Sequence, residues 1–178
     1  QIAPRYDERM SINLRRNLLK AALASFTPTY LFAQKTNDAK FPIPLTVSWS
    51  KLDLMNGETI SYADLKGQVL VIYFWASWCP FCAEQSPEMN KLFINFQSKG
   101  LYVLGVSVDK DFNAAKTHLQ KTKYSFPSAW LGSQDQSKLP KPPSVPFVLV
   151  YNQGGKLVQK EQGQLFAEDV QALARWIN

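Results

Sequence analysis

Residues 69–82 read Val69-Leu70-Val71-Ile72-Tyr73-Phe74-Trp75-Ala76-Ser77-Trp78-Cys79-Pro80-Phe81-Cys82. The run 69–75 is continuously apolar and partly β-branched, which predicts a strand buried on both faces in the middle of a covered sheet. After it, residues 80–97 carry apolar side chains at helical spacing. The two cysteines are therefore expected at a turn between a strand and a helix, at the amino end of the helix.

The sequence on both sides of this stretch predicts further strands and helices. Upstream, residues 45–49 and 59–61 are expected to pair as a hairpin around the Asn56-Gly57 turn signal. Downstream, strands are expected at 101–108, 126–131, 145–151 and 156–160, and helices at 111–123 and 166–177. Strands that alternate with helices and end in a hairpin indicate an α/β domain with a central mixed sheet covered on both faces.

The segment before residue 45 differs in composition from the rest of the chain. Residues 1–9 precede Met10 and are interpreted as upstream or added sequence. Residues 10–33 contain a basic stretch with Arg15-Arg16, a short apolar stretch and a small residue at a boundary, which are the three parts of a secretory signal. The paired arginines resemble the twin-arginine export signal. Cleavage is expected after Ala33, with residues 34–44 as a linker to one domain at 45–178.

An uncleaved basic helix on the membrane surface is the alternative interpretation of residues 10–33. The apolar part of this segment is too short to span a bilayer. A cleaved signal predicts a periplasmic protein, whereas an uncleaved one predicts a protein tethered to the inner membrane.

The composition limits the classes of partner and of site. A hydrophobic content of 46% is enough for one substantial core. Half of the net charge of +6 lies in residues 1–33, so the remainder is too weakly basic to predict nucleic-acid binding. The 2 cysteines exclude a scaffold of several disulfides and a four-cysteine zinc site.

The spacing of Cys79 and Cys82 favours redox chemistry. Thiol-disulfide exchange needs a thiolate that attacks and a second thiol close enough to release the mixed-disulfide partner. Free backbone N–H groups at the helix start favour the Cys79 thiolate, and Pro80 suits the first turn because its missing N–H would have no partner there. Zinc would need more ligands, since His118 lies on another predicted helix. A purely structural disulfide closing so small a loop would add little stability.

Three motifs together resemble the thioredoxin superfamily: residues 74–82, Leu65-Lys66-Gly67 before them, and Val145-Pro146-Phe147 after them. Within it, the chain is most similar to the exported TlpA/ResA/DsbE-like disulfide reductases, over residues 41–178. The resemblance implies the thioredoxin fold, a central mixed sheet flanked by helices, with an added N-terminal β-hairpin. It also implies a thiol-disulfide oxidoreductase that reduces or exchanges disulfides of exported proteins, with cytochrome c maturation as one setting.

The resemblance assigns roles to individual residues. Cys79 becomes the attacking cysteine, Cys82 the resolving cysteine and Pro146 the cis-proline that faces them, although the residues alone favour an ordinary trans proline. Val145 would offer backbone hydrogen bonds to an extended substrate segment. The implied substrate-binding residues are Trp78, Pro80, Phe81, Val145 and Pro146. A monomer is expected, with a redox-active disulfide and no cofactor or metal, acting on protein thiols or disulfides and exchanging electrons with a membrane protein.

Two positions depart from the family pattern. Tyr73 stands where thioredoxin has a buried aspartate, and a tyrosine, which ionises at about pH 10, is a poor proton acceptor. Gln85 stands where the reductases carry an acid, and the neighbouring Glu84 is either a catalytic base or a surface charge near the helix dipole. The Pro80-Phe81 pair differs from the Pro-His of strong oxidants, which favours a reductant or an isomerase.

Two other functions remain compatible with these motifs. A peroxiredoxin-like thiol peroxidase shares the fold, but it needs Thr or Ser three positions before the attacking cysteine, where this chain has Ala76. A copper-binding module would use the two thiols and His118, which is expected on the surface of a helix. Peroxide turnover and Cu(I) binding are the observations that distinguish these alternatives from disulfide exchange.

Overall fold

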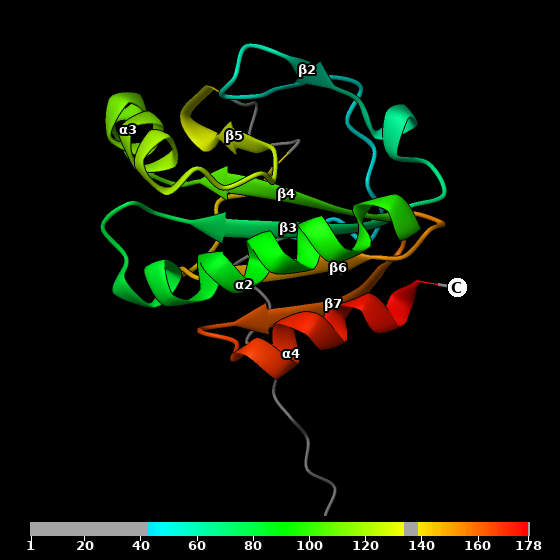
Figure 1. Ribbon diagram of the computed structural model, residues 1–178. Coiled ribbons are helices and arrows are strands. Elements are labelled where there is room, and N and C mark those ends of the chain that lie inside the picture. The colour runs from blue at the N-terminus through cyan, green and yellow to red at the C-terminus, as the bar shows by residue number, and fades with distance from the viewer. Residues whose placement is uncertain (1–42, 134–138, 178) are drawn as a thin grey trace, which may run out of the picture. The chain divides into compact units, whose positions relative to one another are not determined.

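A computed structural model describes residues 43–133 and 139–177 (Figure 1). The predicted upstream sequence, export signal and all but the last two residues of the linker lie outside the described residues. A five-stranded sheet in the order β5-β4-β3-β6-β7 forms the centre of the domain. Its strands are β3 (Val69–Trp75), β4 (Leu101–Ser107), β5 (Ser128–Trp130), β6 (Phe147–Tyr151) and β7 (Leu157–Gln162).

The sheet is mixed, as predicted. Strand β3 pairs in parallel with β4, which pairs in parallel with β5, whereas β6 is antiparallel to both β3 and β7. Every residue of β3 is buried, which confirms the strand predicted at the centre of a covered sheet. Because side chains alternate across a strand, Tyr73 and Trp75 face one core cluster and Ile72 and Phe74 face the other.

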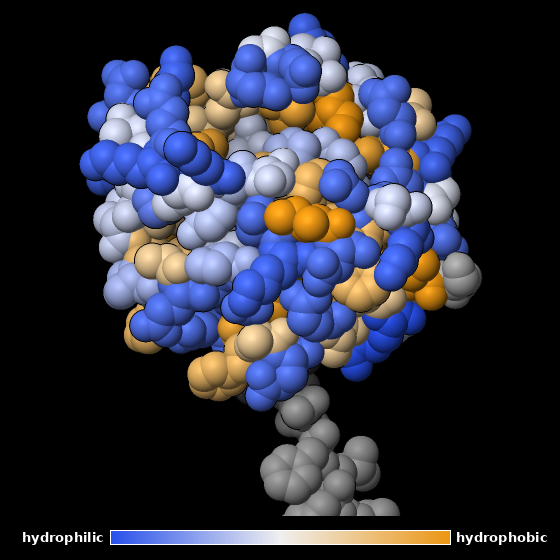
Figure 2. Space-filling model, viewed as in Figure 1, coloured by the Kyte–Doolittle hydropathy of each residue, from blue (hydrophilic) through white to orange (hydrophobic). Residues whose placement is uncertain are grey.

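Three α-helices cover the same face of the sheet (Figure 1). They are α2 (Pro80–Phe96), α3 (Phe112–Thr122) and α4 (Ala167–Ala172). Buried residues from all three join the cluster that contains Tyr73 and Trp75. The C-terminal helix predicted as one piece is instead α4 followed by a 3₁₀ turn, Leu173–Trp176. Figure 2 shows that the surface on this side is largely hydrophilic, with scattered hydrophobic residues, which fits helices whose outer faces meet water.

The N-terminal hairpin is present, but one of its strands was wrongly placed. The hairpin joins β1 (Leu52–Asp53) to β2 (Thr59–Ile60) around Gly57, whose φ of +91° fits the predicted turn. Beside it, Leu54 forms an antiparallel bridge with Ala129, and the Met55 N–H donates to the Ser128 carbonyl at 2.7 Å. The hairpin therefore covers the outer edge of β5, which would otherwise be open to pairing with other chains.

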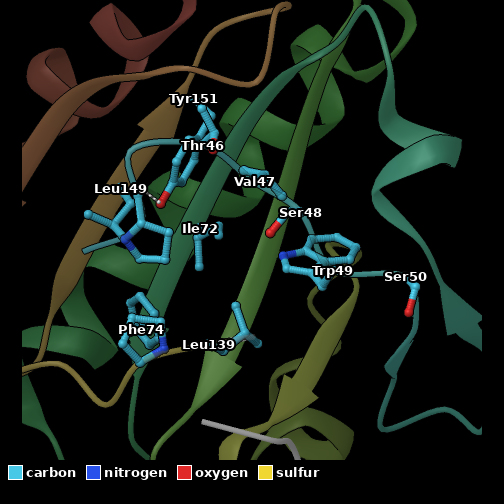
Figure 3. Close-up of a pocket in the computed structure, with 12 residues that line it drawn as sticks. Thr46, Val47, Ser48, Trp49, Ser50, Ile72, Phe74, Leu139, Leu149 and Tyr151 are labelled. Carbon is cyan, nitrogen blue, oxygen red and sulfur yellow. Dashed lines mark hydrogen bonds between the residues drawn. The ribbon is translucent and has the colours of Figure 1, made fainter. Parts of the chain in front are cut away.

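Residues 45–49 form no hairpin strand because they cover the second face of the sheet. Val47 and Trp49 are buried there, and Thr46 forms a bridge with Lys156. A cavity of about 190 Å³ lies between this segment and strands β3 and β6 (Figure 3). Among the described residues its lining contains no Asp, Glu, Lys, Arg or His. Tyr151 donates a hydrogen bond to the Pro44 carbonyl at its edge, at 3.0 Å.

No helix within residues 43–133 and 139–177 combines the length and the apolar character needed to cross a membrane.

Candidate active site

Cys79 and Cys82 form a disulfide at the amino end of α2. Strand β3 ends at Trp75, and a turn closed by the Cys79 N–H and the Ala76 carbonyl, at 3.2 Å, leads into the helix. Cys79 is the N-cap residue, and its sulfur accepts the Cys82 N–H at 3.1 Å. Pro80 takes the first helical position, where no backbone N–H is needed. The geometry therefore directs the Cys82 N–H and the positive end of the helix at the Cys79 sulfur.

The start of β6 lies opposite this sulfur. Antiparallel pairing of β6 with β3 sets Phe147 beside Phe74, so the residues before β6 reach the loop that follows β3. The Val145–Pro146 peptide bond is cis, and the Val145 carbonyl oxygen lies 3.8 Å from Cys79 Sγ. No described residue accepts the Val145 N–H. An extended peptide laid along Val145 would thus find, next to the disulfide, a backbone N–H that no described residue accepts.

The cystine is buried, and exposed apolar side chains flank it. Cys79 and Cys82 are 4% and 2% exposed, whereas Trp78 and Phe81 are 67% and 56% exposed. Pro80 is exposed as well. A cavity of about 640 Å³ opens between Trp78, the residue before Cys79, and Val145. Of the five predicted substrate-binding residues, Trp78 and Val145 line this cavity, whose volume accommodates side chains of a bound peptide, whereas Pro80, Phe81 and Pro146 do not line it.

Tyr73 lies on the buried side of the cystine. Its hydroxyl donates to the Cys82 carbonyl at 3.3 Å and shares a hydrogen bond with Ser86 Oγ at 3.0 Å. Burial raises the pKa of Tyr73 well above its usual value, and the hydrogen bond to Ser86 only partly offsets this effect. Tyr73 is therefore a neutral donor that ties β3 to the first turns of α2, and it cannot take up a proton released by a thiol.

Glu84 and Gln85 both bind the connection between β7 and α4. Gln85 is buried, and its Oε1 accepts the Leu165 N–H at 2.8 Å. Glu84 is exposed, and its carboxylate accepts a hydrogen bond from Gln164 Nε2 at 2.7 Å. These contacts assign both side chains to holding α2 against the β7–α4 connection.

Ser77 and Asp109 are two residues of this site that the sequence analysis did not single out. Asp109 is buried two residues after β4, and its carboxylate accepts the Ser77 N–H at 3.0 Å and the Ser77 hydroxyl at 2.7 Å. A signal was available, because polar residues that follow the carboxyl ends of adjacent parallel strands meet at one edge of a sheet. Ser77 follows β3 and Asp109 follows β4 in this way.

His118, the nitrogen ligand considered for copper, packs against the core. Its ring lies 5.2 Å from the ring of Trp75 and 6.5 Å from that of Tyr124. Desolvation lowers its pKa, and the Asp109 charge partly opposes that shift. In the part of the chain that the structure describes, no group of three or more His, Cys, Asp or Glu side chains is arranged to hold a metal ion.

Known proteins share both the sequence pattern and the architecture. A thiol-disulfide oxidoreductase ResA from Bacillus thuringiensis subsp. konkukian is 25% identical over 117 residues, which cover 66% of this chain and 68% of that protein. A thiol:disulfide interchange protein of the thioredoxin family from Chlorobium tepidum has the same fold, with a TM-score of 0.67, 18% identity, and coverage of 76% of this chain and 97% of that one.

A second solved structure extends the fold comparison to a secreted protein. The secreted Mycobacterium tuberculosis disulfide oxidoreductase, described as homologous to Escherichia coli DsbE, aligns with a TM-score of 0.59 at 18% identity, over 70% of this chain and 93% of that one. The family model of the AhpC/TSA family matches residues 42–160, which include the cysteine pair, Asp109 and the cis-proline. With a match over most of its length, the chain belongs to the AhpC/TSA family.

Proposed function

We propose that the chain is a thiol-disulfide oxidoreductase that reduces or exchanges disulfides of exported proteins through Cys79 and Cys82. The observation that carries the proposal is the disulfide itself, which lies at a helix amino terminus, 3.8 Å from the Val145 carbonyl and beside the cis-proline. The activity named for the ResA relatives supports the same reaction. The disulfide is the redox group, and the reaction requires no further cofactor or metal.

The reaction transfers two electrons in two exchange steps. In the reduced enzyme, the Cys79 thiolate attacks one sulfur of a substrate disulfide, forms a mixed disulfide and releases the other substrate sulfur as a thiolate, which takes up a proton. The Cys82 thiol then loses its proton and attacks Cys79 Sγ. This second step forms the Cys79–Cys82 disulfide found in the structure and releases the second substrate thiol.

Each predicted substrate-binding residue has a place in this reaction. The free N–H of Val145 binds the extended backbone of the substrate, and Pro146 holds that backbone against the disulfide. Trp78, Pro80 and Phe81 contribute the exposed apolar surface that excludes water around the exchanging sulfurs. These contacts use the backbone and general apolar surface, so they suit substrates of varied sequence.

The enzyme works as a reductant in this proposal. The Pro80-Phe81 pair lacks the histidine of strong oxidants, and a dithiol protein of the inner membrane would return electrons to the Cys79–Cys82 disulfide. Residues 10–33 have the parts of an export signal, which supports a periplasmic or membrane-tethered location. The mild charge after that signal supports protein substrates rather than nucleic acid, and a monomer is sufficient because both cysteines lie in one chain.

The test is the reduction of insulin disulfides by the protein in the presence of a dithiol, with Cys79→Ser and Cys82→Ser variants. Cys79→Ser is expected to be inactive, since the attacking sulfur is missing. Reduced Cys82→Ser, incubated with insulin after the dithiol has been removed, is expected to stop after the first step and to accumulate a mixed disulfide with insulin, visible on a non-reducing gel. Turnover by Cys79→Ser at the wild-type rate would overturn the proposal, and rapid peroxide consumption without any disulfide substrate would favour a peroxidase instead.

A further inference from the structure

Asp109 is a buried carboxylate that the exchange reaction itself does not use. It is 4% exposed, and it forms no ion pair with any Lys, Arg or His of the described residues. Its two oxygens accept hydrogen bonds from the Ser77 N–H, the Ser77 hydroxyl and the Ser107 hydroxyl, the last at 2.7 Å. Ser107 Oγ also accepts the Asp109 N–H at 3.1 Å. A buried charge without a cation is costly, so this hydrogen-bond set is what stabilises it.

The bonds from Ser77 join Asp109 to the segment between β3 and α2, whereas those with Ser107 stay at the end of β4. The Trp75 carbonyl accepts the Val108 N–H at 2.9 Å, and Asp109 holds both polar groups of Ser77. Ser77 is therefore tied to the β4–α3 connection on a loop whose next residues are Trp78 and Cys79. An apolar residue at position 109 would leave the Ser77 N–H and hydroxyl without these acceptors.

The effect of this tie depends on the redox state of the cysteines. In the disulfide, the bond to Cys82 holds the Cys79 sulfur at the helix amino terminus. When the bond is reduced, that covalent restraint is lost, and the loop is held by hydrogen bonds alone, among them those from Ser77 to Asp109. The thiolate of Cys79 is stabilised only while its sulfur stays beside the Cys82 N–H, since the field of a helix end falls off within one turn.

We propose that Asp109 is a positioning residue that, through Ser77, keeps the Cys79 thiolate at the amino end of α2 in the reduced protein. The proposal rests on the function proposed above, because a positioned thiolate has value only if Cys79 is the attacking group. It gives Asp109 two measurable effects. Loss of the contact lowers the thiolate fraction of Cys79, and it shifts the reduction potential of the pair to a more negative value, because the reduced form is less stabilised.

The test distinguishes an effect of Asp109 on the position of the Cys79 sulfur from an effect of the Asp109 charge. Removing the negative charge of Asp109 would by itself favour a nearby thiolate, so it acts against the loss of positioning. Asp109→Asn removes the charge but keeps an oxygen that accepts from Ser77, whereas Asp109→Ala removes both. The rate at which iodoacetamide alkylates Cys79 in the reduced, full-length protein reports the thiolate fraction. We expect Asp109→Ala to react about fivefold more slowly than Asp109→Asn, the size of a typical helix-terminus effect, and to have the more negative potential against a glutathione buffer.

A second pair of variants keeps the charge of Asp109 constant. Ser77→Thr retains the hydroxyl and should react like the wild type, whereas Ser77→Ala loses the 2.7 Å bond and should react more slowly. This pair decides the question if Asp109→Ala does not fold. The matched control is Asp111→Asn, which changes the same charge two residues away at an exposed N-cap that does not contact Ser77. Its alkylation rate should equal that of the wild type.

Equal rates within both pairs of folded variants would overturn the positioning role. So would a slowing by Asp111→Asn as large as that by Asp109→Ala, since it would show that the slowing does not depend on the contact with Ser77. The readout needs no disulfide substrate, so it is independent of the insulin assay. A wild-type protein that fails to reduce insulin would contradict the proposed function, and the comparison of alkylation rates would still decide the role of Asp109.

Discussion

Tyr73 is a neutral side chain on the buried side of the Cys79–Cys82 pair, at a position where thioredoxin has a charged one. Its hydroxyl reaches the Cys82 carbonyl and Ser86, and its ring meets that of Phe126 edge to face. The sequence places a tyrosine where thioredoxin has an acid. The fold buries that tyrosine and raises its pKa, so the interior below Cys82 contains no carboxylate at this position.

Tyr73→Phe should lower the free energy of unfolding by about 1 kcal/mol at neutral pH, because a buried hydrogen-bonding hydroxyl is lost. The raised pKa favours the neutral form in the fold, so the stability that Tyr73 contributes is complete below the pKa of an unfolded tyrosine and falls as the pH rises above about 10. Urea titrations at neutral pH and at about pH 11 should therefore show a larger loss for the wild type than for the variant.

The same variant also tests the proton chemistry of the site. Since Tyr73 stays neutral across the working range of the enzyme, the dependence of Cys79 alkylation on pH should have the same shape in Tyr73→Phe as in the wild type. A changed profile below about pH 8 would mean that Tyr73 takes part in proton transfer.

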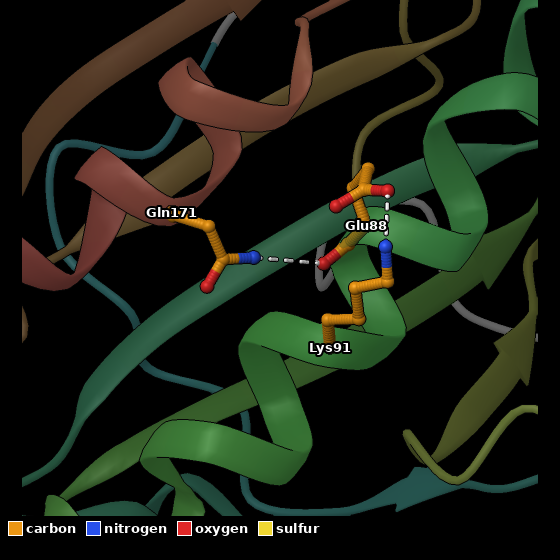
Figure 4. Close-up of polar contacts among 3 residues, drawn as sticks. All are labelled: Glu88, Lys91 and Gln171. Carbon is orange, nitrogen blue, oxygen red and sulfur yellow. Dashed lines mark hydrogen bonds and ion pairs between the residues drawn. The ribbon is translucent and has the colours of Figure 1, made fainter.

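Hydrogen bonds from two successive turns of α2 fix its position relative to α4 and the segment just before α4. Figure 4 shows the Glu88 carbonyl accepting a hydrogen bond from Gln171 of α4, at 3.3 Å, while the Glu88 carboxylate pairs with Lys91 at 2.7 Å. One turn earlier, buried Gln85 binds the Leu165 N–H just before α4. The Gln85 and Gln171 contacts join α2 to α4 and to the segment just before it. The Glu88–Lys91 pair, in contrast, lies on the surface of α2 alone.

Gln85→Leu should lower the free energy of unfolding by about 1–3 kcal/mol, because it leaves the Leu165 N–H without its acceptor. Lys91→Gln is the matched control on the same helix, and an exposed pair of this kind is worth at most about 1 kcal/mol. Chemical denaturation of both variants is the measurement. A loss no greater for Gln85→Leu than for Lys91→Gln would contradict the role given to Gln85.

At the scale of the whole molecule, the cysteine pair and the N-terminal segment pack on opposite faces of one sheet. The helices and the cysteine pair belong to the first core cluster, whereas the N-terminal segment closes the second. Trp49 is 6% exposed in that second cluster and packs edge to face against Tyr62. Because the segment makes no contribution to the helix amino terminus, its packing should affect stability more than reactivity.

Trp49→Ala should therefore cost about 3–5 kcal/mol of unfolding free energy, the usual range for removing a buried tryptophan. At a temperature where the variant remains folded, the alkylation rate of reduced Cys79 should match that of the wild type. Leu45→Ala, at a position 74% exposed in the same segment, is the control and should change neither quantity measurably. Slower alkylation in folded Trp49→Ala would show that the two faces are coupled.

The local sequence pattern was sufficient to predict the elements whose structure depends on residues close together in the chain. The unbroken apolar run 69–75 is buried in any covered sheet, and the helix that follows Pro80 begins where an N-cap and a proline suit its first turn. The turn at Gly57 was likewise predictable, but its first strand was not. Residues 45–49 alternate like a hairpin strand, and only the presence of an uncovered sheet face explains why they pack across it instead.

The sequence by itself determined the chemistry of this protein, because two cysteines three positions apart at a strand-to-helix turn have few other uses. The family resemblance also predicted Val145 and Pro146 beside them, whereas only the tertiary structure showed that Asp109 binds the adjoining loop. Asp109 lies 32 positions from Ser77, and Val145 lies 66 positions from Cys79. These residues come together because β3 pairs in parallel with β4 and antiparallel with β6. Strand pairing brings distant residues to one edge of a sheet, and no local sequence pattern encodes which strands will be neighbours.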